Sequence, residues 1–374
     1  MKAVYVYSRI EDNIEASGEA KKAKMQVAAL NQLGVETSFY LNDKLISLYK
    51  LRIRMPWFKA YSKSFVDEVL NYIRDENIEC VYIRKYLIDA SFLKFLERLK
   101  NQNLIVLLEI PTFPYDAEWK KFVDWPLLFK EKRFRKKLGG LVDRIITYST
   151  DESIFGIKCI NSSNGIDTTK VPVREKRKHD DNRIVLLGVA TLEKWHGYDR
   201  LIRGISTYNI QNPDIRVEFD IVGEGAEFNN LKKLADNLNL NEYIHFHGFL
   251  SGQQLTDLFE KADIGVGSLG MYRIGLYEGY TLKLREYMSR GLPFIYAYDD
   301  NLIERTNCDY FIKFSNDNTE INIDNIVQFY QKVRNQTDVE KKMHGLAEKY
   351  LTWNSQMKPI ADYLEEKMEE MNND

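Results

Sequence analysis

The amino-acid sequence predicts an α/β fold made of two Rossmann-like, doubly wound domains that face a cleft. The chain has 374 residues, 44% of them hydrophobic, whereas single domains cluster near ~100–200 residues. Short β-prone runs alternate with helical patterns through both halves, which favours parallel sheets covered on both faces. A charged stretch poor in large apolar residues, 174–183, indicates a linker between the two series.

The first half begins with a β-prone run and a helical pattern that stops at Gly34. We expect strands at residues 3–7, 35–40, 80–83, 104–110 and 144–149, and helices at 19–33 and 90–99. Asn164-Gly165-Ile166-Asp167 is a turn signal that closes this series. The pattern predicts an N-terminal domain of residues 1–167.

The second half repeats the alternation. Strands are expected at residues 184–188, 217–222, 243–246, 264–266 and 294–297, with helical patterns between them. An amphipathic helix from about residue 356 to 371 ends the chain. We therefore expect a C-terminal domain of residues 168–355, with the terminal segment 356–374 packing back on the first domain.

Composition narrows the possible partners and compartments. A formal net charge of −2 and a pI near 6.3 give no general attraction to nucleic acid. Cys80, Cys159 and Cys308 are odd in number and widely spaced, which fits neither a disulfide framework nor a zinc site. The N-terminus lacks the apolar region of a signal peptide, and no apolar run approaches the ~20 residues of a membrane span. We expect a cytoplasmic protein, with a peripheral position on the inner face of the membrane as an option.

Four motifs of the second half each follow a predicted strand or open a helix. In chain order they are Lys194-Trp195-His196-Gly197, Gly223-Glu224-Gly225, His247-Gly248 and Glu278-Gly279-Tyr280-Thr281. The carboxyl ends of parallel strands meet at one edge of a sheet, and ligands of open α/β sheets bind there. We expect the four motifs to lie close together at such an edge.

Glu278 and Glu286 are separated by seven residues around a predicted helix N-terminus. A pair of glutamates at this spacing is by itself more often a solvated helix face. Here Gly279, Tyr280 and Thr281 would offer unpaired backbone N–H groups, which bind a diphosphate readily. One carboxylate would then be available to sugar hydroxyls and the other to ribose hydroxyls.

In these motifs the sequence resembles the group 1 glycosyltransferases of family 4, retaining enzymes with a GT-B fold. The second half carries most of the resemblance, through residues 187–188, 195–200, 222–225, 246–248, 262–263, 283–288 and 291–293. The first half contributes Ser17-Gly18, residues 109–116 and residues 164–167, and looks most like enzymes of bacterial surface polysaccharide assembly.

The resemblance implies transfer of a sugar from a nucleoside diphosphate sugar to a glycan or lipid-linked acceptor, with retention of configuration. It implies a catalytic role for Glu278, and we expect a second catalytic role for Lys194, the local cation of the loop after the first strand of the second half. It implies donor binding by Glu286, Gly279, Tyr280, Thr281, Glu224, Gly225, His247, Gly248, His196 and Lys283, and acceptor-side roles for Ser17, Gly18 and Glu109.

Two departures from the family pattern concern charge. Ala190 and His196 stand where the family usually has an Arg and a Lys that bind the diphosphate, which leaves Lys194 as the nearest cation. Lys283 or Arg273 could supply a second charge, and the sequence does not decide between them. The chain has no Asp-x-Asp pair, so we expect neither a metal nor another cofactor.

Two basic and aromatic stretches of the first half, residues 49–63 and 129–138, suit a membrane headgroup interface or an ordinary solvated helix face. Nucleic acid is disfavoured because no binding module accompanies them. Two other functions stay open. A nucleotide-sugar epimerase of the same architecture would convert the donor without an acceptor, and a GT-B binding subunit would bind the donor without turnover.

Overall fold

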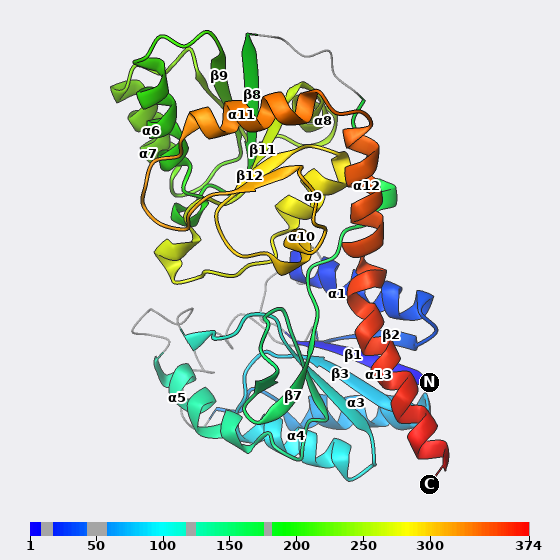
Figure 1. Cartoon of the computed structure of the whole chain (residues 1–374). Helices are drawn as coiled ribbons and strands as arrows, with labels where there is room; N and C mark the ends of the chain where they lie inside the picture. Colours follow the sequence, from blue (N-terminus) through cyan, green and yellow to red (C-terminus); the bar gives the residue numbers. More distant parts are fainter. Residues whose placement is uncertain (9–17, 43–57, 117–124, 176–181, 374) are drawn as a thin grey trace. The chain divides into compact units, whose positions relative to one another are not determined.

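The computed structural model describes residues 1–8, 18–42, 58–116, 125–175 and 182–373. They belong to two compact units (Figure 1). Unit 1 consists of residues 1–164 and 353–374, and unit 2 of residues 165–352. The stretch 174–183 does not behave as a linker throughout, because Arg174 is buried in unit 2 and donates to the carbonyls of Arg290 and Ala262. Residues 176–181 lie outside the described residues.

Unit 1 is a seven-stranded sheet in the order β2-β1-β3-β4-β5-β7-β6, parallel except for the β6–β7 pair. Its strands are β1 (Lys2–Ser8), β2 (Glu36–Asn42), β3 (Cys80–Arg84), β4 (Ile105–Ile110), β5 (Arg144–Thr147), β6 (Ser153–Ile154) and β7 (Ile157–Asn161). Its helices are α1 (Gly18–Gln32), α3 (Lys63–Asp75), α4 (Ala90–Lys100), α5 (Trp125–Phe134), the short η4 (Arg135–Lys137) and α13 (Trp353–Asn373).

Helices cover both faces of the unit 1 sheet because its strands are apolar on both sides. Val4 and Val6 of β1 belong to the core shared with α3 and α4, whereas Tyr5 and Tyr7 belong to the core shared with α1 and α13. This alternation follows the two-residue period of a strand. The C-terminal helix α13 packs on α1 through a buried face that includes Met357 and Ile360, so the last helix of the chain completes the first unit.

Unit 2 is a six-stranded parallel sheet in the order β10-β9-β8-β11-β12-β13. Its strands are β8 (Arg183–Val189), β9 (Arg216–Val222), β10 (Ile244–Gly248), β11 (Ile264–Val266), β12 (Phe294–Tyr296) and β13 (Phe311–Lys313). Its helices are α6 (Tyr198–Asn209), α7 (Phe228–Asn237), α8 (Gly252–Lys261), α9 (Leu282–Arg290), α10 (Asn301–Glu304), α11 (Ile323–Arg334) and α12 (Val339–Tyr350), with the short helices η5 (Thr168–Lys170), η6 (Lys194–His196) and η7 (Met271–Ile274).

Both strand orders reverse direction once. In unit 2 the order turns at the β8/β11 pair, as in dinucleotide-binding sheets, and in unit 1 it turns at the β1/β3 pair, as in flavodoxin-like sheets. At such a point the loops from neighbouring strands diverge and leave a crevice for a ligand at the carboxyl edge. The predicted α/β class is confirmed, and the two switch points indicate where each unit would bind.

Gly223 and Gly225, which follow β9, pack against the loop that follows β8. Both have positive φ angles, of 125° and 156°. A Cβ atom on Gly223 would lie 1.8 Å from the carbonyl oxygen of Ala190, and one on Gly225 would lie 2.3 Å from that of Leu192. The amide of Leu192 in turn donates to the carbonyl of Glu224 at 2.8 Å. The two glycines therefore allow the backbone of one loop to lie directly against the other.

We predict that Gly223→Ala destabilises unit 2 by about 2 kcal/mol or more, because it combines a disfavoured φ with an overlap on backbone atoms. Gly252→Ala is the matched control, since Gly252 also has a positive φ, of 59°, but open space around it. That control should cost about 1 kcal/mol. Calorimetric unfolding of the two variants measures the difference, and equal costs would contradict the packing argument.

Candidate functional site

The N-terminus of α9 lies at the carboxyl edge of the unit 2 sheet and has no side-chain cap. Thr281 is the N-cap residue, but its hydroxyl shares a 2.6 Å hydrogen bond with the Tyr298 hydroxyl instead of capping the helix. The first N–H groups of a helix need an acceptor from outside it. Gly279 packs close to Met271 and Tyr298. This end of α9 can therefore receive an anion through its backbone.

Glu278 is half-buried at the start of this segment. Its Oε1 accepts hydrogen bonds from the Tyr280 hydroxyl and, at 3.2 Å, from Nδ2 of Asn301. The backbone beside it is anchored by the amide of Gly279, which donates to the carbonyl of Asp299 at 2.9 Å. Tyr280 thus contributes its side chain as well as its backbone, which the spacing of the motif did not predict.

Glu286 lies about one turn into α9 and is held by Arg290. Its Oε1 accepts from Nε of Arg290 at 3.0 Å and lies 2.9 Å from Nη2 of the same guanidinium. Arg290 is buried, and its guanidinium lies 4.0 Å from the ring centroid of Phe259. The carboxylate of Glu286 remains partly exposed, so it is oriented by the protein and still open to a ligand.

His196 lies in η6, next to Tyr198 of α6. Its Nδ1 accepts a hydrogen bond from the Glu193 amide at 3.2 Å, so the proton of the neutral ring is on Nε2. Burial, with the nearby charge of Lys283, lowers the pKa of His196 to about 2. His196 is therefore neutral at physiological pH, and it can donate a hydrogen bond to a ligand but cannot replace a cation.

Lys283 occupies the first turn of α9 and reaches across to α6. Its Nζ donates to the Tyr198 hydroxyl at 3.1 Å and lies 5.4 Å from the centroid of that ring. Burial lowers the pKa of Lys283 to about 7. The structure thus places Lys283 beside His196 and the uncapped end of α9.

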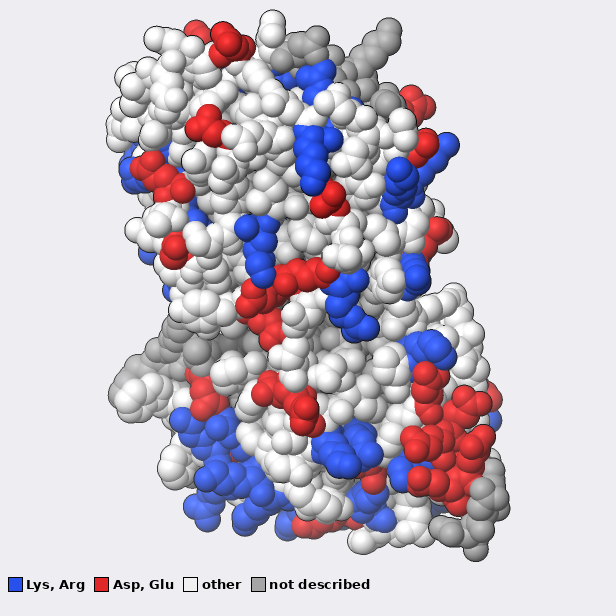
Figure 2. Space-filling model, viewed as in Figure 1, with Lys and Arg blue, Asp and Glu red and all other residues white. Residues whose placement is uncertain are grey.

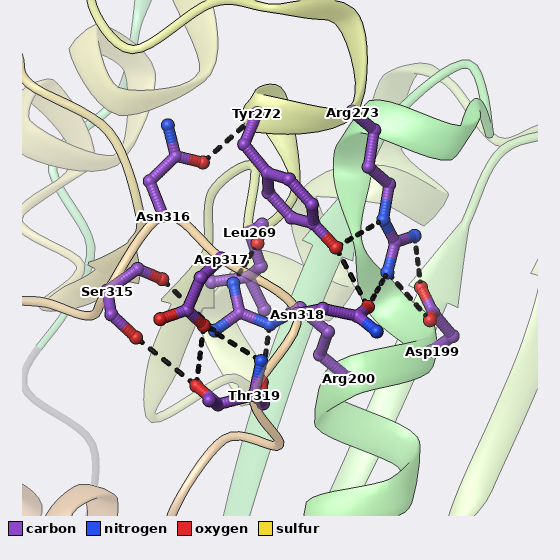
Figure 3. A network of polar contacts seen from close by, with 10 residues as sticks. All are labelled: Asp199, Arg200, Leu269, Tyr272, Arg273, Ser315, Asn316, Asp317, Asn318 and Thr319. Atoms are coloured by element: carbon purple, nitrogen blue, oxygen red, sulfur yellow. Dashed lines mark hydrogen bonds and ion pairs between the residues drawn. The ribbon is translucent and has the colours of Figure 1, made fainter.

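Arg273, the other candidate for the second charge, is committed to a structural network (Figure 3). Its guanidinium forms a bidentate ion pair with Asp199, with distances of 2.7 and 2.9 Å. It also bonds the Tyr272 hydroxyl and the carbonyl of Lys194. Buried Arg200 donates to the carbonyls of Leu269, Ser315 and Thr319 in the same network. These arginines fasten η7 to η6 and α6, so Arg273 is not available as a ligand for a diphosphate.

Lys194 of η6 is exposed at the surface of unit 2. Its exposed side chain lines an open hollow of about 510 Å³, together with Asp199, Arg203, Glu227 and Arg273. Glu278, Lys283 and Glu286 do not line this hollow. The catalytic role expected for Lys194 therefore has less geometric support than the role expected for Lys283.

Of the remaining expected donor residues of unit 2, His247 and the two glycines have structural partners, and Glu224 is exposed. Nε2 of His247 lies 2.7 Å from Oδ1 of Asp220 on β9. Gly248 accepts from the Gly223 amide at 2.7 Å. Glu224 is exposed, and Gly225 fits against the β8 loop. These residues form the edge of the sheet. Among them, Glu224 has an exposed carboxylate that a ligand can reach.

On the acceptor side, Glu109 is fully buried in β4. Its carboxylate accepts from the hydroxyls of Tyr5, Tyr82 and Tyr148, at 2.8, 2.9 and 3.2 Å. It also accepts from Gln26 and forms an ion pair with Arg84. Glu109 therefore cannot touch an acceptor directly, and it positions Arg84. Gly18 is the first residue of α1, and Ser17 lies outside the described residues.

Among residues 1–8, 18–42, 58–116, 125–175 and 182–373, no group of three or more His, Cys, Asp and Glu side chains is arranged to hold a metal ion. Within the same ranges, no helix combines the length and the apolar character that a membrane crossing requires.

Part of the chain matches a known protein family. Residues 170–349 match the family model of the glycosyl transferases group 1. A mannosylfructose-phosphate synthase of Agrobacterium fabrum is 27% identical over 133 residues, which are 34% of this chain and 28% of that enzyme. The match thus spans less than a third of that relative.

Solved structures resemble the whole chain. Sucrose-phosphate synthase from Thermosynechococcus elongatus has a TM-score of 0.65 at 14% identity, with 100% of both chains covered. A glycosyltransferase from Rickettsia africae has a TM-score of 0.64 at 13% identity, with 98% of both chains covered. Anabaena HepE in complex with UDP has a TM-score of 0.61 at 14% identity, covering 98% of this chain and 100% of that one. At such identities the likeness shows the fold. Residues 170–349 are thus similar to the group 1 glycosyltransferases, and the two units of the chain have the α/β sheets of the GT-B fold.

Proposed function

We propose that this chain transfers a sugar from a nucleoside diphosphate sugar, bound by unit 2, to a glycan or lipid-linked acceptor, with retention of configuration. The observation that carries the proposal is the uncapped N-terminus of α9, which has Glu278 just before it, Lys283 in its first turn and Glu286 one turn further on. This set offers backbone donors and a cation to a diphosphate, and carboxylates to two sets of hydroxyls.

The comparisons support the donor class. HepE of Anabaena, whose fold this chain shares, has been solved in complex with UDP and with UDP-glucose. The lipopolysaccharide outer core galactosyltransferase WaaB has the same fold, with a TM-score of 0.62. On the basis of these similarities, we propose that this chain acts in bacterial polysaccharide or glycoconjugate synthesis.

Lys283 is the cation that we propose for the diphosphate, in place of Lys194. His196 stands at the position where the family pattern has a lysine and is neutral, while Lys283 approaches the same region from α9. The developing charge of the leaving diphosphate would then be stabilised by the N–H groups of α9 and by Lys283, without a metal. A thermal-shift screen against nucleotide sugars tests donor binding, since a ligand at ~100 times its dissociation constant stabilises by ~2.7 kcal/mol.

Substitutions of Glu278 and Glu286 should have different effects on turnover and on nucleotide binding. Glu278→Gln removes the charge that favours positive character on the transferred sugar, so turnover should fall by ~100-fold or more while nucleotide affinity stays near that of the parent. Glu286→Gln weakens the contact to ribose, so nucleotide and donor should both lose ~1–3 kcal/mol of binding free energy. Steady-state kinetics and nucleotide calorimetry on both variants separate these effects. Normal turnover of Glu278→Gln would refute the assignment.

Donor binding should depend on pH through Lys283. Its pKa is lowered to about 7 in the free protein, and a bound diphosphate favours the charged form and raises that pKa. Binding therefore takes up a proton above pH 7, so affinity should be constant below the free pKa and fall as pH rises through it. Calorimetry should show a loss of ~10-fold or more between pH 7 and 9.

Lys283→Met should remove most of this pH dependence and weaken nucleoside diphosphate more than nucleoside. Lys194→Met is the matched control, because Lys194 is an exposed lysine of the same unit. If Lys194→Met no longer binds the diphosphate and Lys283→Met still does, Lys194 and not Lys283 is the cation that binds it.

We also propose a peripheral membrane contact through α5 and η4. Figure 2 shows Lys and Arg gathered over these elements at the lower left. Trp125 and Phe129, one turn apart, are 62% and 69% exposed. The exposed basic residues beside them are Lys132, Arg133, Lys136 and Lys137. Exposed aromatic rings among basic side chains suit an anionic headgroup layer.

Lys130 and Arg135 of this stretch are not exposed, and exposed Lys132 lies 3.3 Å from Asp116. Lys130 is buried and donates to the carbonyl of Phe58, and Arg135 is paired with Asp116. In the other basic stretch, Tyr61 is buried and residues 49–57 lie outside the described residues. The membrane proposal therefore rests on the surface of α5 and η4.

Lys136→Glu combined with Lys137→Glu should reduce partitioning onto anionic vesicles by at least ~10-fold at low salt, since each basic residue near the surface contributes ~1 kcal/mol. Lys341→Glu with Lys342→Glu, an exposed pair on α12, is the control. Co-sedimentation measures both. Equal binding of the parent to neutral and anionic vesicles would remove the membrane contact and leave the enzymatic proposal untouched.

A further inference from the structure

Unit 1 has a pocket of its own at the switch point of its sheet. The pocket has a volume of about 300 Å³ and lies at the carboxyl ends of β1, β3 and β4. Ser8, Arg84, Lys85, Tyr86 and Thr112 line it, with Glu19 of α1. A parallel sheet binds its ligands at this edge and at this kind of strand reversal.

Arg84 and Lys85, the two cations among the described residues that line the pocket, are each paired with a buried carboxylate. Arg84 pairs with Glu109, and Lys85 lies 3.2 Å from Glu131. Both cationic side chains are 11% exposed, whereas both carboxylates are 0% exposed. A ligand in the pocket can therefore reach the basic groups and not the acids that balance them.

The carboxylates are held in place by further donors. Glu131 accepts from the Ile88 amide and from the Tyr115 hydroxyl, both at 2.8 Å. Lys85 also lies 4.0 Å from the centroid of the Tyr115 ring. Glu109 has the hydroxyls of three tyrosines around it. Burial lowers the pKa of Arg84, but the charge of Glu109 outweighs it and the pKa is raised, so Arg84 stays charged.

Such buried ion pairs do little for stability. Removing two charges from water costs about as much as their attraction returns, and apolar residues of the same size often serve a fold equally well. Two adjacent pairs at a switch point are thus better explained by recognition than by folding. The geometry favours a planar or tetrahedral anion, which arginine and lysine bind together well.

Ser8 provides an independent sign of a missing ligand. It is 5% exposed, it lines the pocket, and its hydroxyl has no hydrogen-bond partner among the described residues. A buried hydroxyl without a partner is costly and uncommon. The carboxylate at the rim, Glu19, is 38% exposed and lies 3.8 Å from Arg84. It can accept from ligand hydroxyls, since it is not buried behind the cations.

We propose that this pocket binds the acceptor through an anionic group, a phosphate or a carboxylate, which Arg84 and Lys85 contact, while Ser8 and Glu19 bond its hydroxyls. The inference rests on the proposed function in that the ligand is taken to be the acceptor. The pocket and its charges are observations on unit 1 alone.

The test is calorimetry on the full chain, with the donor site saturated by the nucleoside diphosphate that gives the largest thermal shift. The probes are glucose 6-phosphate, glucuronate and farnesyl phosphate, which distinguish a sugar phosphate, a carboxylate and a lipid phosphate, with neutral glucose as reference. At least one anionic probe should bind ~10-fold or more tightly than glucose. Arg84→Met should abolish that preference, and Arg74→Met, an exposed arginine of the same unit, should keep it.

Lys85→Met replaces Arg84→Met if the latter does not fold, because it removes the second cation through a different buried partner. Anionic probes that bind no better than glucose, or a preference that survives both Arg84→Met and Lys85→Met, would overturn the inference. A preference lost in Lys283→Met instead would place the anion in unit 2. Nucleotide binding without anion preference would contradict this inference alone, and anion preference without nucleotide binding would contradict the proposed function alone.

Discussion

The close approach of the loops that follow β8 and β11 is the constraint on which the donor site of unit 2 depends. Gly197 has a φ of 62°, and a Cβ atom there would lie 2.6 Å from the backbone of Leu269 and Gly270. The amide of Leu269 donates to the carbonyl of His196 at 2.8 Å. Because the two loops are in contact, Tyr198 lies within reach of Lys283. The same contact fixes the beginning of the segment that leads to the N-terminus of α9.

The two units hold their basic residues in different ways. In unit 1, Arg84 and Lys85 are each paired with a buried carboxylate. In unit 2, Lys283 has the Tyr198 hydroxyl as its partner and no carboxylate among the described residues. A charge that appears fully only when a diphosphate arrives suits a group that must bind a donor and later release the nucleotide, whereas fixed cations suit selection among acceptors.

The sequence predicted what local patterns determine. Apolar runs placed β8 and β11 within a residue of their observed bounds, and the glycine-rich ends of strands indicated the ligand edge. It did not predict contacts between distant residues. The tyrosines around Glu109 come from positions 5, 82 and 148, which no spacing connects. The sequence favours Lys194 because no other Lys or Arg lies in the loop after β8, whereas Lys283 comes from α9 and reaches the Tyr198 hydroxyl beside His196.

A crystal structure of the chain with a bound nucleoside diphosphate would show which residues bind the donor. We expect the diphosphate oxygens to lie about 3 Å from the first backbone N–H groups of α9 and from Nζ of Lys283, with the ribose hydroxyls at Glu286. A diphosphate bound instead in the hollow lined by Lys194, Arg203 and Arg273, with α9 free of ligand, would contradict this expectation.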